Sequence, residues 1–525
     1  MAASKLPQCI ENAKTHTQAD RSALVESTRL NDTLCTELSK INEMGDSPPI
    51  AACFTLEKSQ LSTWRSEFFT LPINRLAQNV CTACDPISAC IRQDQKSLTM
   101  PGKEHFEVTK LTKSTVGGPK WICAGLDLLR LSMRKDCELS APYLFYWHKL
   151  ERCNYFLHTV IELLARCEPI DGRTFKYLMK HTVPDGGNWQ MFVNLIQKYG
   201  VMPKQSYQAS WSSTRSLHLN KMLRSKLHEF SCRLHAKFTF DGDSHMLRLM
   251  MEPMIEELYK IISICLGTPP VNFTWSLKDE DQRLIYTPLS FYQAMIEPYF
   301  SREAQVCLGH DPRLSSIFNR NYHIANSSNM IDGLQQSYIN QPMEILLETI
   351  VKSLAAGSAV WLACDLPVLY NKNLDVLSLK TYHFDQVFGM PVDTALDKAE
   401  RMLYKATRRN TVLLLTEVTL DAVRQPLQFS TMRKVTEPTT TKKTDSSDSL
   451  RLPEAVEADA EAKQDAVKRK VASGKATVLN VDWLREYGFE IVVDSRYVPP
   501  GVMHALQTQP SVELPVWDPM GALLS

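Results

Sequence analysis

The chain has 525 residues and a formal net charge of +1, with 44% hydrophobic and 22% charged residues. This length allows two or three domains with a sizeable core, and the composition is ordinary for a globular protein. The near-zero net charge excludes a case for nucleic-acid or membrane binding from bulk electrostatics.

The N-terminal region, residues 1–60, is polar with weak periodicity, and it predicts an extension with a short helix around 19–43. Its first part carries Glu11, Asp20 and Glu26 and no apolar run, which is unlike a secretory signal. We therefore expect a cytoplasmic protein whose 14 cysteines are reduced.

Two local patterns are best explained by ordinary structural roles. Cys81 and Cys84 have the spacing of a redox or zinc pair, but no second pair lies nearby, so we expect partly buried thiols and neither a metal nor another cofactor. The most apolar window, Leu354–Cys364, is too short to span a bilayer and predicts a buried strand.

Apolar periodicity places helices mainly in the first half of the chain and strands mainly at its end. Helical spacing is found at 121–134, 143–166, 188–199 and 216–266. Strand-like runs are found at 359–363, 411–418, 477–481 and 489–493. Helices first and strands last predict an α+β fold.

Residues 437–475 differ from the rest, with no aromatic residue and many charged, Ser, Thr and Ala residues. Such a segment cannot bury enough apolar surface to order itself, so we predict a disordered insert.

A series of short segments in a consistent order forms the most specific pattern of the chain. The DGGNW loop at 185–189 and the WDPMGALLS tail at 517–525 are its strongest members. The others include AQNV (77–80), PYLFYWHKLERC (142–153), CLGTPP (265–270), TPLSFY (287–292), HDPR (310–313), AVWLACD (359–365), VFGM (387–390), DKAER (397–401) and VVDSRYVP (492–499). Together they resemble the bleomycin hydrolase family of papain-like cysteine peptidases.

The resemblance implies a papain-like fold over residues 61–525. It implies a helical part at about 61–350, with helical embellishments at about 205–350, and a β-rich part at about 351–510. The insert interrupts the β-rich part, and a C-terminal arm covers 511–525.

In this family a cysteine attacks the peptide carbonyl, a histidine acts as its base, an asparagine orients the histidine, and a glutamine completes the oxyanion hole. The resemblance puts the cysteine at Lys120, directly before Trp121 and Ile122, and the glutamine at Ser114. The remaining two positions are the histidine at Phe384 and the asparagine at Thr436. All four residues are replaced, and removing one member of such a unit already removes most of the rate.

Displaced groups offer two alternatives. Cys123 follows Lys120 by one helical turn and could pair with His383, the neighbour of Phe384. On a strand, however, His383 would face away from the side on which Phe384 lies. Ser114 and Lys120 could instead form a Ser–Lys pair, although nothing in their spacing specifies it.

The substrate-binding parts of the family pattern are kept. Gly186 and Gly187 match the loop whose backbone pairs with an extended peptide in papain-like enzymes, and a tight turn between helices is the alternative. The resemblance also implies that the arm lies in the cleft and that the chain assembles as a hexameric ring.

Two functions follow from these patterns. The first is a catalytically inactive homologue, a pseudo-peptidase that binds peptides or a protein partner, or that assembles as a homo-oligomer or in mixed rings with an active paralogue. The second is a working cytoplasmic cysteine-type aminopeptidase that uses displaced residues.

Overall fold

The computed structural model describes residues 55–92, 100–109, 118–133, 137–241, 244–276, 284–366, 368–392, 396–433 and 476–524. The predicted helix at 19–43 and the predicted insert at 437–475 lie outside the described residues. The chain divides into two units, Met1–Asn79 and Val80–Ser525. The first unit contains α2 (Lys58–Thr70) and the beginning of α3 (Pro72–Ala83).

The second unit contains most of the helices. They are α4 (Pro86–Cys90), α5 (Lys120–Ser132), α6 (Ala141–Ala165), α7 (Arg173–Lys180), α8 (Trp189–Tyr199), α9 (Trp211–Thr214), α10 (Leu217–Asp241), α11 (Ser244–Leu249), α12 (Met251–Leu266), α13 (Pro288–Met295), α14 (Met343–Ala355), α15 (Phe384–Phe388), α16 (Lys398–Leu403), α18 (Val481–Tyr487) and α19 (Pro500–Thr508).

The strands all belong to the second unit. They are β1 (Glu104–Glu107), β2 (Phe273–Trp275), β3 (Leu284–Tyr286), β4 (Gln305–Gly309), β5 (Asn321–Ile324), β6 (Ser337–Asn340), β7 (Val360–Cys364), β8 (Tyr370–Asn371), β9 (Val376–Leu377), β10 (Thr411–Leu420), β11 (Pro426–Thr431), β12 (Val478–Asn480), β13 (Gly488–Asp494) and β14 (Ser511–Leu514).

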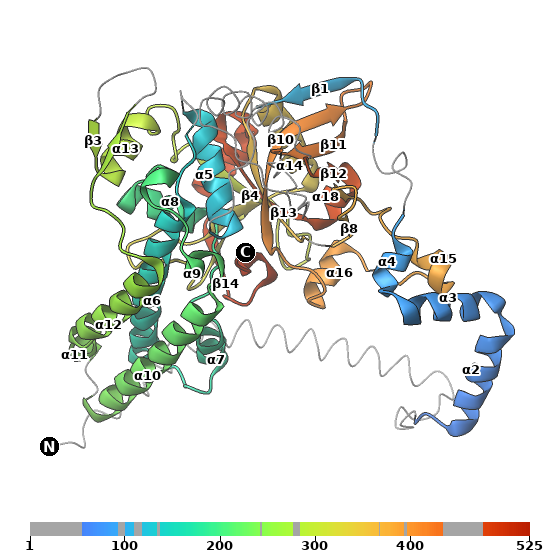
Figure 1. The fold of residues 1–525 in the computed structure, drawn as a ribbon, viewed down its shortest axis with the longest axis horizontal. Helices are drawn as coiled ribbons and strands as arrows, with labels where there is room; N and C mark the ends of the chain where they lie inside the picture. The colour runs from blue at the N-terminus through green and yellow to red at the C-terminus, as the bar shows by residue number, and fades with distance from the viewer. Residues whose placement is uncertain are drawn as a thin grey trace, which may run out of the picture. The chain divides into compact units, whose positions relative to one another are not determined.

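One large mixed sheet organises the second unit. Its strand order is β14-β5-β6-β4-β13-β7-β10-β11-β12-β9-β8, and β1 pairs with β10 outside this path. The pairs β14–β5, β4–β6 and β12–β9 are parallel, and the other pairs of the sheet are antiparallel. Figure 1 shows α6, α8, α10 and α12 grouped on one side of this sheet.

The sheet separates two hydrophobic cores, because successive side chains of a strand point to opposite faces. In β7, Trp361 and Ala363 join the core shared with α5, α6, α8 and α12. Val360, Leu362 and Cys364 join the core under α14 and α18. All five residues of β7 are buried, which explains the continuous apolar run in the sequence.

Local sequence signals fix the helices that bear the site. Ser140 caps α6 by accepting a hydrogen bond from the Tyr143 backbone N–H, and Asn188 caps α8 by accepting one from the Met191 N–H. Gly200 ends α8 at φ 66°, a conformation that favours glycine.

The predicted α+β, papain-like class is confirmed, and the predicted late strands correspond to β7, β10, β12 and β13. The large sheet also takes in β4, β5 and β6, which the sequence analysis did not predict and which come before residue 350. Among the described residues, no helix combines the length and the apolarity needed to cross a membrane.

Candidate functional site

Lys120 begins α5, with Pro119 as the preceding cap residue, and its side chain is exposed. It lines a cavity of about 170 Å³ together with Tyr370, Thr411 and Thr431. Because α5 packs against β10 on one side and against α6 and α8 on the other, its N-terminus lies where the helices meet the sheet. The residue that the sequence analysis assigns to the nucleophile position therefore carries an amine at a junction of the fold.

The thiols close to this position are core residues. Cys123 is 2% exposed, and its Sγ donates to Gly118 O at 3.7 Å. Cys364 is fully buried; burial raises the pKa of its thiol, and the charge of Lys120 offsets only part of that rise. A buried thiol with a raised pKa is a poor nucleophile, because the thiolate is the reactive form.

Phe384 and His383 lie at the start of a short helix, so the strand expected at these residues is wrong. Phe384 begins α15 and is buried against Tyr382 and Phe388, with ring centroids 5.2 and 6.5 Å away. The backbone N–H of His383 donates to Cys90 O at 2.8 Å, which fixes the turn into the helix. Packing of Phe384 and Phe388 on one helical face then favours helix over strand.

The imidazole of His383 is engaged away from Cys123. Its Nδ1 lies 3.2 Å from Nη2 of Arg92, while Cys123 contacts Gly118 in front of α5. Neither His383 nor Phe384 lines the cavity at Lys120. The structure gives the proposed Cys123–His383 pair no shared contact, and Ser114 and Thr436 lie outside the described residues.

The glycine loop around Gly186 and Gly187 pairs with the C-terminal tail. The Gly187 N–H donates to Leu524 O at 3.0 Å, and the Leu524 N–H donates to Gly187 O at 2.8 Å. A Cβ on Gly187 would lie 2.5 Å from the ring of Trp121, and one on Gly186 would lie 2.9 Å from Leu523 Cβ. Glycine is required at both positions because neighbouring atoms come too close for a side chain. The loop presents a backbone edge for β-type pairing, and the tail occupies that edge.

Buried basic residues of α6 hold this loop in place. Lys149 Nζ donates to Val183 O at 3.0 Å and lies 2.6 Å from Asp185 Oδ1. Burial raises the pKa of Asp185, but the Lys149 charge and hydrogen bond outweigh it and leave the pKa below its usual value. Trp121 Nε1 donates to Asp185 O at 2.9 Å, so α5 is tied to the same loop.

His148 packs beside Lys149 in the same helix and is fully buried. Its Nε2 lies 3.4 Å from Pro184 O, and its ring meets Trp121 edge to face at 5.1 Å. Its Nδ1 has no hydrogen-bond partner. Burial, with the charges of Lys149 and Arg152, lowers the pKa of His148 to about 3, so the ring is neutral at neutral pH.

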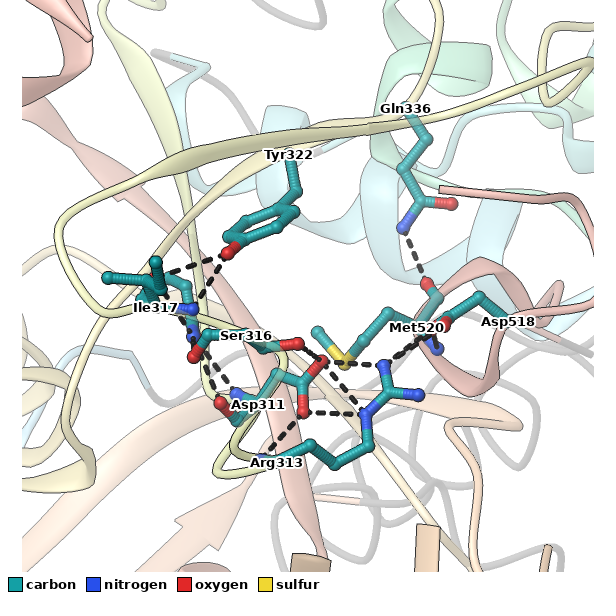
Figure 2. A network of polar contacts seen from close by, with 9 residues as sticks. Asp311, Arg313, Ser316, Ile317, Tyr322, Gln336, Asp518 and Met520 are labelled. Carbon is teal, nitrogen blue, oxygen red and sulfur yellow. Dashed lines mark hydrogen bonds and ion pairs between the residues drawn. The ribbon is translucent and has the colours of Figure 1, made fainter. Parts of the chain in front are cut away.

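The tail is anchored by a separate polar network (Figure 2). Arg313 Nη2 bridges Asp311 at 2.6 Å and Asp518 at 2.9 Å. Gln336 Nε2 donates to Met520 O at 3.0 Å, and Arg409 Nε donates to Ala522 O at 2.9 Å. Met520 and Leu524 are fully buried, so the tail is part of the core of the second unit.

The basic residues of α6 were missed by sequence reasoning. His148, Lys149 and Arg152 all come from the segment PYLFYWHKLERC, and each is 4% exposed or less. The available signal was three basic residues inside a helix with apolar residues on every side. Such a helix is buried all round, and its charges then need partners.

The described geometry contains a glycine loop and a tail that pairs with it. None of the described residues that line the cavity at Lys120 is a His or a Cys, and the Lys120 side chain itself cannot supply a thiolate. Within the described ranges, no three His, Cys, Asp or Glu side chains gather closely enough to hold a metal ion.

Known proteins similar to this chain are peptidases of one type. A model of the Peptidase C1-like family matches residues 55–433 and 470–521. Bleomycin hydrolase of Gallus gallus is 32% identical over 480 residues, which cover 88% of this chain and 98% of that protein. Its Homo sapiens counterpart is 31% identical over 460 residues, covering 85% and 94%.

More distant similarities agree. Aminopeptidase C of Listeria monocytogenes is 27% identical over 427 residues, which cover 79% of this chain and 86% of that protein. The crystal structure of PepW from Lactobacillus rhamnosis HN001 has a TM-score of 0.75 at 23% identity, covering 89% of this chain and 99% of that one. This last similarity concerns the fold.

Proposed function

We propose that this chain, which belongs to the Peptidase C1-like family, is a member in which peptide cleavage has been lost. The observation that carries the proposal is Lys120 at the first position of α5, where the family pattern has its cysteine. No histidine is among the described residues that line the cavity with Lys120, which supports the proposal independently. The retained fold and cleft loop then serve binding or assembly.

The contact between Gly187 and Leu524 limits what can bind. Both hydrogen bonds that the Gly187 backbone offers to an extended chain are made with the tail. A peptide can use this edge only if the tail is displaced, because each N–H and C=O forms one ladder bond. This favours assembly over open peptide binding as the role of the retained scaffold.

A working cysteine-type aminopeptidase is the second candidate, and the aminopeptidase C similarity favours it. It needs a nucleophile other than Lys120, and Cys123 is the nearest thiol along α5. The burial of Cys123 counts against that role.

The variant Lys120→Cys tests whether restoring a thiol at the nucleophile position is enough to restore activity. We expect no appreciable turnover of aminoacyl fluorogenic substrates, because a thiol without a neighbouring base stays largely protonated at neutral pH. Lys120→Ser is the matched control, since it removes the amine without adding a thiol. Thiol titration and thermal unfolding verify that the new thiol is accessible and the fold intact. Turnover well above that of Lys120→Ser would mean that a base is present and that the histidine position has been misassigned.

Assembly is proposed to follow the family as a hexameric homo-oligomer, open to mixed rings with an active paralogue. Loss of a catalytic group changes no surface contact, so it gives no reason to lose the ring. Light scattering on the purified chain is expected to give about six times 59.7 kDa. A monomer at micromolar concentration would remove this part of the proposal and leave the catalytic part intact.

A further inference from the structure

A cavity of about 380 Å³ lies beside the cleft loop and the tail. Its walls come from α6 and α7, from the loop around Asp185 and Gly186, and from the tail around Gly521–Leu523. This volume is in the range of small-ligand sites, roughly 300–1,000 Å³. The cavity is separate from the one at Lys120, with which it shares no lining residue.

Arg152, from α6, lines this cavity and is 4% exposed. Its Nη1 donates to Ser328 O, and its guanidinium lies over the ring of Tyr155 at 5.3 Å. Its Nε is buried without a hydrogen-bond partner, and no carboxylate of the described residues forms an ion pair with it. A buried cation is costly without a counter-ion, and none of the described carboxylates supplies one, so an added anion would be stabilising.

A second arginine and two rings complete the cationic wall. Arg408 lines the cavity and is exposed, and Tyr177 lines the same cavity. Burial raises the pKa of Tyr177, while the charges of Arg152 and Arg408 both lower it. The ring of His181 lies 4.6 Å from that of Tyr177, centroid to centroid, and is tilted by 39°. Burial lowers the pKa of His181, and the charges of Lys180 and Arg408 lower it further, so this wall is crowded with positive charge.

The single carboxylate among the lining residues, Asp185, is already neutralised. Its Oδ1 lies 2.6 Å from Lys149 Nζ and accepts from Asn220 Nδ2 at 3.0 Å, and its Oδ2 accepts from the Ser216 hydroxyl. The Asp185 carboxylate therefore does not neutralise Arg152 or Arg408, and the cavity keeps a net positive charge.

We propose that this cavity binds an oxyanion, a phosphate or carboxylate group, with Arg152 and Arg408 as its charge partners and Asn326 among its polar lining residues. The planar guanidinium matches the paired oxygens of such groups, and buried charge-assisted hydrogen bonds are strong. Because the tail forms one wall, the bound anion also holds the tail against the loop. The site is independent of whether the chain cleaves peptides.

Titration calorimetry on the full chain tests the site at constant ionic strength. The probes are inorganic phosphate, a tetraglutamate peptide with blocked ends, and the matching tetraglutamine peptide. We expect saturable binding of phosphate or tetraglutamate and none of tetraglutamine. Binding of both anions means that a free oxyanion suffices, and binding of tetraglutamate alone means that the carboxylates come from a peptide.

Two variants locate the binding. Arg408→Gln is expected to fold because its side chain is exposed, and to weaken binding at least about tenfold. Arg233→Gln removes an exposed guanidinium from α10, far along the chain from the cavity wall, and should bind as wild type. Absence of saturable anion binding, equal binding of tetraglutamine, or wild-type affinity in Arg408→Gln would overturn the proposal.

Discussion

Replacing Arg409 with methionine is expected to lower the free energy of unfolding by about 3–5 kcal/mol. Arg409 and Glu490 are both fully buried, and Nη1 lies 2.7 Å from Oε2. Without Arg409, a buried carboxyl group keeps only the hydrogen bond from Gln336. Burial already raises the pKa of Glu490, and losing the guanidinium raises it further.

Arg409 also joins the tail to the sheet, because its Nε donates to Ala522 O. Urea unfolding of Arg409→Met should therefore show a lower midpoint, and hydrogen exchange of the tail should speed up. The double variant Arg409→Met, Glu490→Leu should recover much of the loss, since the unpaired carboxyl group is then gone. A loss below about 1 kcal/mol in the single variant would show that the pair is not as buried as described.

Acidification is expected to destabilise the fold through His148. Its pKa is about 3 in the folded chain, against 6.5 for the free side chain, so the unfolded chain binds the extra proton between these values. The stability that the neutral imidazole contributes is present above pH 6.5 and is lost as the pH falls towards 3. From pH 6.5 to about 4.5 the loss is roughly 2 kcal/mol, because the slope reaches the full 1.36 kcal/mol per unit only once the unfolded imidazole is mostly protonated.

The variant His148→Gln isolates this effect, because the carboxylates titrate alike in both proteins. Its free energy of unfolding should fall by roughly 2 kcal/mol less than that of wild type over the same pH interval. His504→Gln, at an exposed position of α19, controls for loss of an imidazole as such. Parallel pH profiles of wild type and His148→Gln would contradict the burial of a neutral imidazole.

Sequence reasoning succeeded where local pattern and burial agree. The continuous apolar run at 359–364 predicts β7 because both faces of that strand are covered. The strands β5 and β6 were not predicted because they are short and mix polar with apolar residues, with the sequences NYHI and SYIN. Their pairing depends on partners far away in the chain, including the pairing of β14 with β5.

In the candidate site, too, local features could be predicted from the sequence and features that depend on distant contacts could not. The need for glycine at 186 and 187 was predicted from the sequence, and the structure leaves room for only a hydrogen at both positions. The helix at Phe384 was not, because the contact from His383 to Cys90 that starts it spans almost 300 residues. The roles of Lys149 and Arg152 also needed the fold, since periodicity identifies a helix but not the backbone carbonyls of Val183 and Ser328 to which these side chains donate.

Turnover by the purified wild-type chain is the most direct test of lost catalysis. Aminoacyl fluorogenic substrates and a thiol-directed epoxide probe should be applied to wild type, Lys120→Ser and Cys123→Ala side by side. We expect all three to show the same background rate and no labelling of a cleft thiol. Peptidase turnover by wild type that Cys123→Ala abolishes would contradict the loss of catalysis and assign the reaction to a displaced thiol in α5.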